Sequence, residues 1–97
     1  MNMQAMMMQA KKLQKEIEKT TTEIDNKLFK YENDNICVEC LGNNTIKKIE
    51  IKNEDILSDK ELLEDIMLVA INNILNQILD EKNTKLGKYT NGLGGLF

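Results

Sequence analysis

The sequence has no histidine, arginine, proline or tryptophan among its 97 residues. Without histidine it lacks the side chain that most often acts as a general base near neutral pH and most often binds metal ions. Without arginine it lacks the planar guanidinium that binds a phosphate through two parallel hydrogen bonds. These absences argue against most hydrolases, zinc enzymes and phosphoryl-transfer enzymes. We therefore predict a protein that is not an enzyme, has no metal site and needs no cofactor.

Charged residues are abundant, but their signs nearly balance. Thirteen lysines stand against sixteen acidic residues, for a formal net charge of −3. The whole molecule is therefore not a polycation, and any contact with nucleic acid must come from a local patch. Residues 1–30 carry six lysines and four acidic residues, whereas 31–56 and 57–97 are both net acidic. The only positive segment is thus the first one.

The length is that of one domain, which we place at residues 1–97. No run of 18 apolar residues occurs, so we expect no membrane span and no membrane partner. The start of the chain has neither an early positive charge nor a long apolar stretch, which argues against a secretory signal. We expect a cytoplasmic protein, in which Cys37 and Cys40 stay reduced.

The beginning of the chain predicts a helix over residues 3–25. Apolar or weakly polar residues recur at alternating intervals of three and four, as in a heptad seam that packs on one other helix. The members of this seam are Met3, Met6, Ala10, Leu13, Ile17, Thr20 and Ile24. Residues 28–52 change to an alternating pattern and predict a three-stranded antiparallel meander, with a turn at Gly42-Asn43-Asn44. A change of parity between Ile46 and Ile49 predicts either a bulge or a strand that starts late.

A second helix is predicted over residues 58–86. Ser58 and Glu61 match a capping box, and Gly87 matches a helix stop. The apolar residues of this helix cover more than one face, so one side of a small sheet cannot bury them all. Either the first helix covers the remainder, or a second copy of the chain does so across a two-fold axis. Residues 87–97 form a glycine-rich tail. The overall prediction is an α+β fold that assembles as a homodimer.

Four lysines of the first helix are the main candidates for a binding site. Lys11, Lys12, Lys15 and Lys19 lie opposite the apolar seam, where a row of ammonium groups can follow phosphates. The alternative is a solvated face whose lysines pair with glutamates four residues away, as Lys12–Glu16 and Lys19–Glu23 could. Four further lysines could extend such a patch near the sheet: Lys27, Lys30, Lys47 and Lys48.

The pair Cys37 and Cys40 forms a lone CxxC on a predicted strand. Residues i and i+3 of a strand point to opposite faces, so the two sulfurs do not converge on a metal ion or a disulfide. We expect both cysteines to be structural.

Taken together, several segments resemble the YbaB/EbfC family of nucleoid-associated proteins. They are the opening Met6–Lys19, the strands around Gly42 and Ile49-Glu50-Ile51, the stretch from Leu62 to Asn72, and the ending from Leu86 to Phe97. The resemblance covers essentially the whole chain. It implies a bacterial homodimer that binds double-stranded DNA with little sequence preference and has no catalytic activity. By analogy, the lysine-bearing first helix would be the DNA-binding arm.

A rival class is an interaction protein without enzymatic activity. Its apolar seam and the terminal Leu96-Phe97 could dock a replication or recombination protein, and its acidic remainder would then repel DNA. The two classes differ in their response to salt, because contact with DNA weakens steeply as salt rises and apolar docking does not.

Overall fold

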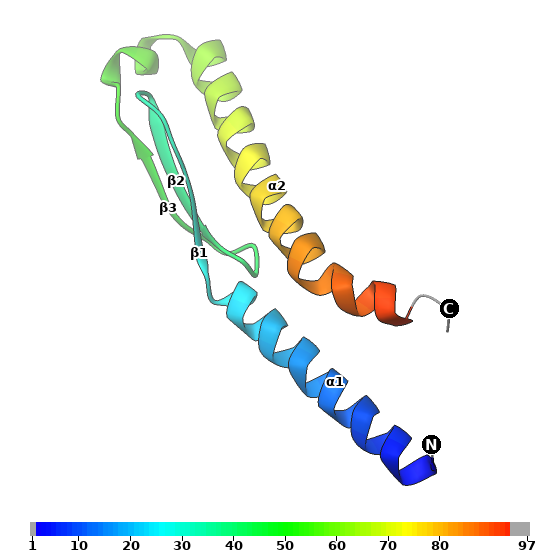
Figure 1. Cartoon of the computed structure of the whole chain (residues 1–97). Coiled ribbons are helices and arrows are strands. Elements are labelled where there is room, and N and C mark those ends of the chain that lie inside the picture. Colours follow the sequence, from blue (N-terminus) through cyan, green and yellow to red (C-terminus); the bar gives the residue numbers. More distant parts are fainter. Residues whose placement is uncertain (1, 94–97) are drawn as a thin grey trace.

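The computed structural model describes residues 2–93. The order of elements is α1 (Met3–Asp25), β1 (Leu28–Glu32), β2 (Ile36–Leu41), β3 (Ile46–Ile51), the 3-10 helix η1 (Glu54–Ser58) and α2 (Lys60–Leu93). The strands form one antiparallel sheet in the order β1-β2-β3, which confirms the predicted α+β fold and meander (Figure 1). Residues 94–97 of the predicted tail lie outside the described part of the chain.

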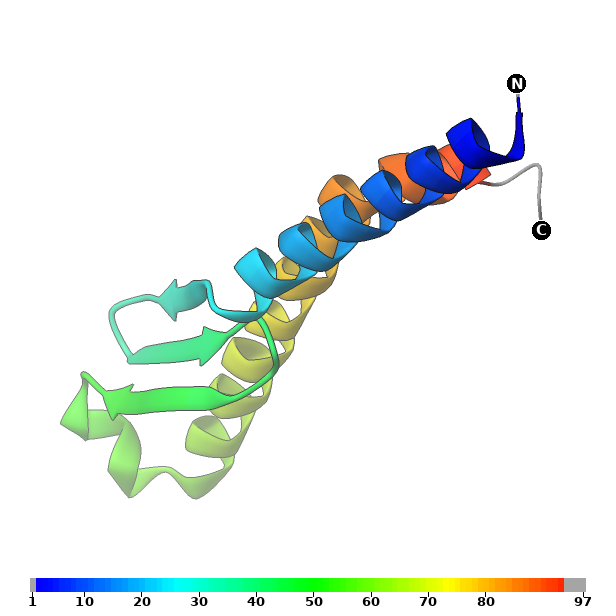
Figure 2. The same ribbon diagram turned by 90° about the horizontal axis from the view of Figure 1, so that it is seen from below.

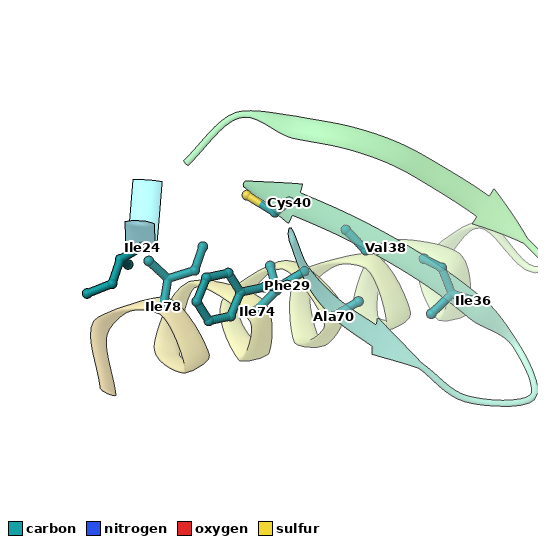
Figure 3. Close-up of a cluster of buried hydrophobic side chains, with 8 residues drawn as sticks. All are labelled: Ile24, Phe29, Ile36, Val38, Cys40, Ala70, Ile74 and Ile78. Carbon is teal, nitrogen blue, oxygen red and sulfur yellow. The ribbon is translucent and has the colours of Figure 1, made fainter. Parts of the chain in front are cut away.

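The core lies between the sheet and α2. Ile36, Val38 and Cys40 are fully buried on one face of β2, against Ala70 and Ile74 of α2 (Figure 3). Phe29 of β1, Ile24 of α1 and Ile78 of α2 complete this cluster. Because Ile24 is the last apolar residue of α1, the base of that helix is fixed to the core.

The molecule is much longer than a compact domain of its size. It measures 69 × 22 × 15 Å, with a radius of gyration of 19.4 Å, against about 13 Å for a compact chain of 100 residues. Both helices extend from one end of the sheet in the same direction (Figures 1 and 2). They form an arm in which α1 and α2 run in opposite chain directions.

The second helix begins and ends later than its sequence signals predict. Ser58 belongs to η1, where its hydroxyl donates a hydrogen bond to the carbonyl of Asp55. Asp59 caps the helix instead, because its carboxylate accepts a hydrogen bond from the amide of Leu62. At the other end the helix continues through Gly87 to Leu93. No described glycine has a positive φ, so Gly87 does not adopt the left-handed conformation that ends many helices.

The turn between β2 and β3 also differs in detail from its prediction. Asn44, and not Gly42, is the left-handed residue, with φ of 69°. Gly42 instead packs directly on the end of α1, where a Cβ atom would lie 1.8 Å from the carbonyl oxygen of Ile24. Its amide donates a 3.0 Å hydrogen bond to the carbonyl of Lys27. Gly42 therefore fixes the arm to the sheet. The predicted bulge is confirmed, because Lys47 has no partner between the pairs Glu39–Lys48 and Cys40–Ile46.

Candidate nucleic-acid interface

The predicted seam of α1 is covered at its base and open toward its tip. Ile24 is buried, and Thr20, Ile17 and Leu13 are half-buried. Toward the N-terminus the exposed fraction rises to 56% at Met6 and 77% at Met3. The heptad pattern therefore locates the face of α1 that turns toward α2. Within one protomer, α2 covers only the C-terminal part of this face.

The predicted lysine stripe is present on the opposite side of α1. Lys11, Lys12, Lys15 and Lys19 are all exposed and line one shallow groove of about 430 Å³ together with Met8 and Glu16. Within residues 2–93, none of these four lysines forms an ion pair. The alternative pairs Lys12–Glu16 and Lys19–Glu23 are thus not formed. The structure brings four ammonium groups without an ion pair among the described residues to one helix face.

Most of the lysines near the sheet are engaged with carboxylates. Lys30 and Lys48 pair with Glu32 and Glu50 at 3.3 and 3.7 Å, and Lys52 reaches Glu32 at 3.1 Å. The hydrogen bond to Glu32 raises the pKa of Lys30, and the hydrogen bond from Lys52 is the main cause that lowers the pKa of Glu32. Lys47 makes no ion pair among the described residues. On the outer face of the sheet, most lysine charges are therefore balanced by neighbouring glutamates, whereas the four lysines of α1 form no ion pair with any described carboxylate.

At the base of the arm, Lys27 is held by α2. Its ammonium lies 2.6 Å from the carboxylate of Glu81, whose side chain is 18% exposed, and 5.0 Å from the centroid of the Phe29 ring. The same carboxylate approaches Lys85 at 3.8 Å. Lys27 thus links the base of α1 to α2. Its ammonium group is less available to an external anion than those of the four stripe lysines.

The extension of α2 carries lysines that the sequence analysis did not consider. Lys85 and Lys88 lie on the part of α2 that runs along the arm, and the ammonium of Lys88 lies over the Tyr89 ring at 4.9 Å. Lys88 lies beyond the helix end predicted at Gly87, whereas Lys85 lies within the predicted helix but was assigned to no site. The strong helix formers Glu81, Lys82, Lys85 and Leu86 all precede Gly87, and no comparable signal in the sequence extends the helix beyond it.

The cysteines form no site. Cys40 belongs to the core cluster, whereas Cys37 is buried on the other face of β2, and neither forms a disulfide. Burial raises the pKa of the Cys40 thiol. In the part of the chain that the structure describes, no three residues among aspartate, glutamate and cysteine are placed to hold a metal ion.

A second notable surface is apolar and runs along α2 and β3. Ile46 and Ile49 point to the core side of the sheet, opposite Cys40 and Val38, yet they are 42% and 44% exposed. The exposed α2 residues on the adjoining flank are Leu68, Leu75 and Leu79. Leu75 and Leu79 line a hollow of about 240 Å³ with Asn44 of the β2–β3 turn. We call these five residues, Ile46, Ile49, Leu68, Leu75 and Leu79, the apolar flank.

Averaged hydropathy shows how apolar α2 is. By length and composition alone, Lys60–Tyr89 could cross a membrane, with mean hydropathy of 1.3 over its most apolar 18 residues. The criterion of an uninterrupted apolar run did not detect this. One face of the helix packs on the sheet through Ala70, Ile74 and Ile78, but only 17% of that window is buried. Leu68, Val69 and Leu79 are each more than half exposed, so a substantial apolar surface of α2 is uncovered in a single protomer.

Comparison of the sequence with known proteins identifies the family. The model of the YbaB/EbfC DNA-binding family matches residues 1–93. The chain belongs to this family. A nucleoid-associated protein of Lactococcus lactis subsp. lactis is 44% identical over 97 residues, which cover 96% of this chain and 97% of the relative. One from Enterococcus faecalis is 39% identical over 98 residues, covering 97% and 93%. No solved structure matches the chain.

As a member of the YbaB/EbfC family, the chain belongs to a family of DNA-binding proteins and not to a family of enzymes. The matched residues include all of α1, the sheet and α2, so the match extends across the whole described fold.

Proposed function

We propose that this protein is a nucleoid-associated homodimer that binds double-stranded DNA through the phosphate backbone, with little preference for sequence. The contacts come from Lys11, Lys12, Lys15 and Lys19. The observation that carries the proposal is that these four ammonium groups share one exposed face of α1 and have no carboxylate partner among the described residues. Bacterial relatives named as nucleoid-associated proteins support the location on the nucleoid.

The mechanism is release of counterions from DNA. Each lysine that neutralises a phosphate frees a condensed cation, and the gain in entropy favours binding. Lys12 and Lys19 are separated by seven residues, or about 10 Å along the helix at 1.5 Å per residue. A lysine is a point charge without a fork, so these contacts position the protein on DNA but do not read its bases.

The apolar flank is the proposed dimer interface. Ile49 and Leu79 would otherwise leave hydrocarbon in water on both β3 and α2, and a second copy that brings the same surface buries both sets. The lysine stripe lies on α1, away from the residues of the flank, so it stays accessible in the dimer. Two arms then present eight stripe lysines to one duplex.

Salt dependence tests the proposal. With at most eight phosphate contacts per dimer, the logarithm of the binding constant should fall linearly with the logarithm of salt concentration, with a slope no steeper than about −7. At physiological salt we expect a dissociation constant of roughly 10⁻⁴ to 10⁻⁶ M, the range of non-specific binding. Fluorescence anisotropy with a labelled random duplex measures both. No binding, or binding that ignores salt, would favour the rival interaction protein, in which the apolar flank docks another protein.

A further inference from the structure

One exposed apolar side chain lies at the N-terminal end of the lysine stripe, on the same helix face. Met8 is 72% exposed and lines the same groove as Lys11, Lys12, Lys15 and Lys19. A single exposed apolar residue on a surface is ordinary. Met8 differs because it shares one helix face with the four lysines, one turn before Lys11, and because that face lies opposite the seam that turns toward α2.

The helix geometry gives Met8 a particular direction. At roughly 100° of rotation per residue, Lys11 and Lys15 project to one side of Met8, and Lys12 and Lys19 project to the other. When the two sets of lysines reach toward the phosphates on either side of a groove, Met8 points at the groove floor. The major groove of DNA, about 12 Å wide, admits an α-helix, whereas the minor groove, about 6 Å wide, does not.

We propose that Met8 contacts the methyl groups of thymine in the major groove and gives the arm a modest preference for A·T-rich DNA. Thymine is the only standard base with an apolar group at the edge that faces this groove. The thioether of methionine is flexible and polarisable, so it adapts to methyl groups at different positions along the groove. The inference rests on the proposed function, because the lysines must first hold α1 on the duplex.

Replacing thymine with uracil tests this contact. The two bases pair alike and present the same groups in the minor groove, and uracil lacks only the methyl group. The wild-type protein should bind a thymine-containing duplex about fourfold more tightly than its uracil counterpart for each methyl group that it covers. Anisotropy titrations of both duplexes at one low salt concentration measure the ratio.

Variants of two methionines identify the side chain responsible. Met8→Gln should bind both duplexes equally, because its polar amide gains nothing from the thymine methyl group, while glutamine matches methionine in length and helix propensity. Met8→Leu should keep the preference. Met6→Gln is the matched control, since Met6 is 56% exposed but lies on the seam, and it should behave as wild type.

Three outcomes would overturn the inference. Equal affinity of the wild type for the two duplexes excludes the methyl contact. A thymine preference that survives in Met8→Gln shows that Met8 is not its cause and that another feature, for instance the shape of the duplex, is responsible. Failure of the wild type to bind either duplex contradicts the proposed function itself and removes the inference with it, so the two failures are distinguishable.

Discussion

Simultaneous charge reversal of Lys12, Lys15 and Lys19 to glutamate is expected to abolish the gel shift of duplex DNA. The change removes six of the eight stripe lysines of a dimer and puts six carboxylates against the phosphates. With about two phosphate contacts left per dimer, the log–log slope of the salt dependence should weaken from about −7 to about −2, and no shift should appear at protein concentrations at which the wild type shifts the duplex. The three side chains are exposed and form no ion pair within the described chain, so the fold does not depend on them.

Two controls accompany this variant. Glutamates at positions 12 and 19 would face Glu16 and Glu23 one turn away, and like charges at that spacing weaken a helix by about 0.2–0.5 kcal/mol per pair. The triple Lys→Gln variant avoids this repulsion and should also bind weakly. Charge reversal of Lys47 and Lys60, which lie off the arm, should leave more binding than the triple reversal. Wild-type affinity in the triple reversal variant, with its melting temperature unchanged, would refute the assignment.

The second large effect is expected from Gly42→Ala. The added Cβ would lie 1.8 Å from the carbonyl oxygen of Ile24, and backbone cannot move aside as a flexible side chain can. Relief of the clash must separate α1 from the sheet and strain the hydrogen bond between the Gly42 amide and Lys27. We expect a loss of about 3 kcal/mol in the free energy of unfolding, the upper end of the usual cost of overpacking. Chemical denaturation followed by circular dichroism measures it.

Gly87→Ala is the matched control for this loss. A Cβ atom at Gly87 meets nothing within 4 Å, and the residue lies inside α2. Alanine is preferred over glycine in a helix interior by about 0.5–1 kcal/mol, so this variant should be more stable than the wild type. If Gly42→Ala unfolds at the same denaturant concentration as the wild type, Gly42 does not fix the arm to the sheet.

The patterns in the sequence located the elements because each depends on neighbours within a few residues. Alternation places Ile36, Val38 and Cys40 on one face of β2, and the change of parity before Ile49 marks the bulge at Lys47. The spacing of the lysines on α1 likewise follows from helical periodicity alone. The lysine stripe could therefore be predicted from the sequence without knowledge of the tertiary contacts around α1.

Long-range contacts were not predictable in the same way. Gly42 reads as a turn glycine, but its role comes from the approach of Ile24, eighteen residues earlier. Lys27 looks as free as Lys19 in the sequence, and only the fold brings it to Glu81, 54 residues away. The stop signal at Gly87 fails because α2 continues along the arm, and Leu86 packs against the core.

The proposed dimer joins two copies of the chain through the apolar flank and leaves a lysine stripe free on each arm. Sedimentation equilibrium in the analytical ultracentrifuge, at micromolar protein, measures the mass of the species in solution. We expect a single species with twice the mass of one chain. A stable, folded species with the mass of one chain would exclude this dimer.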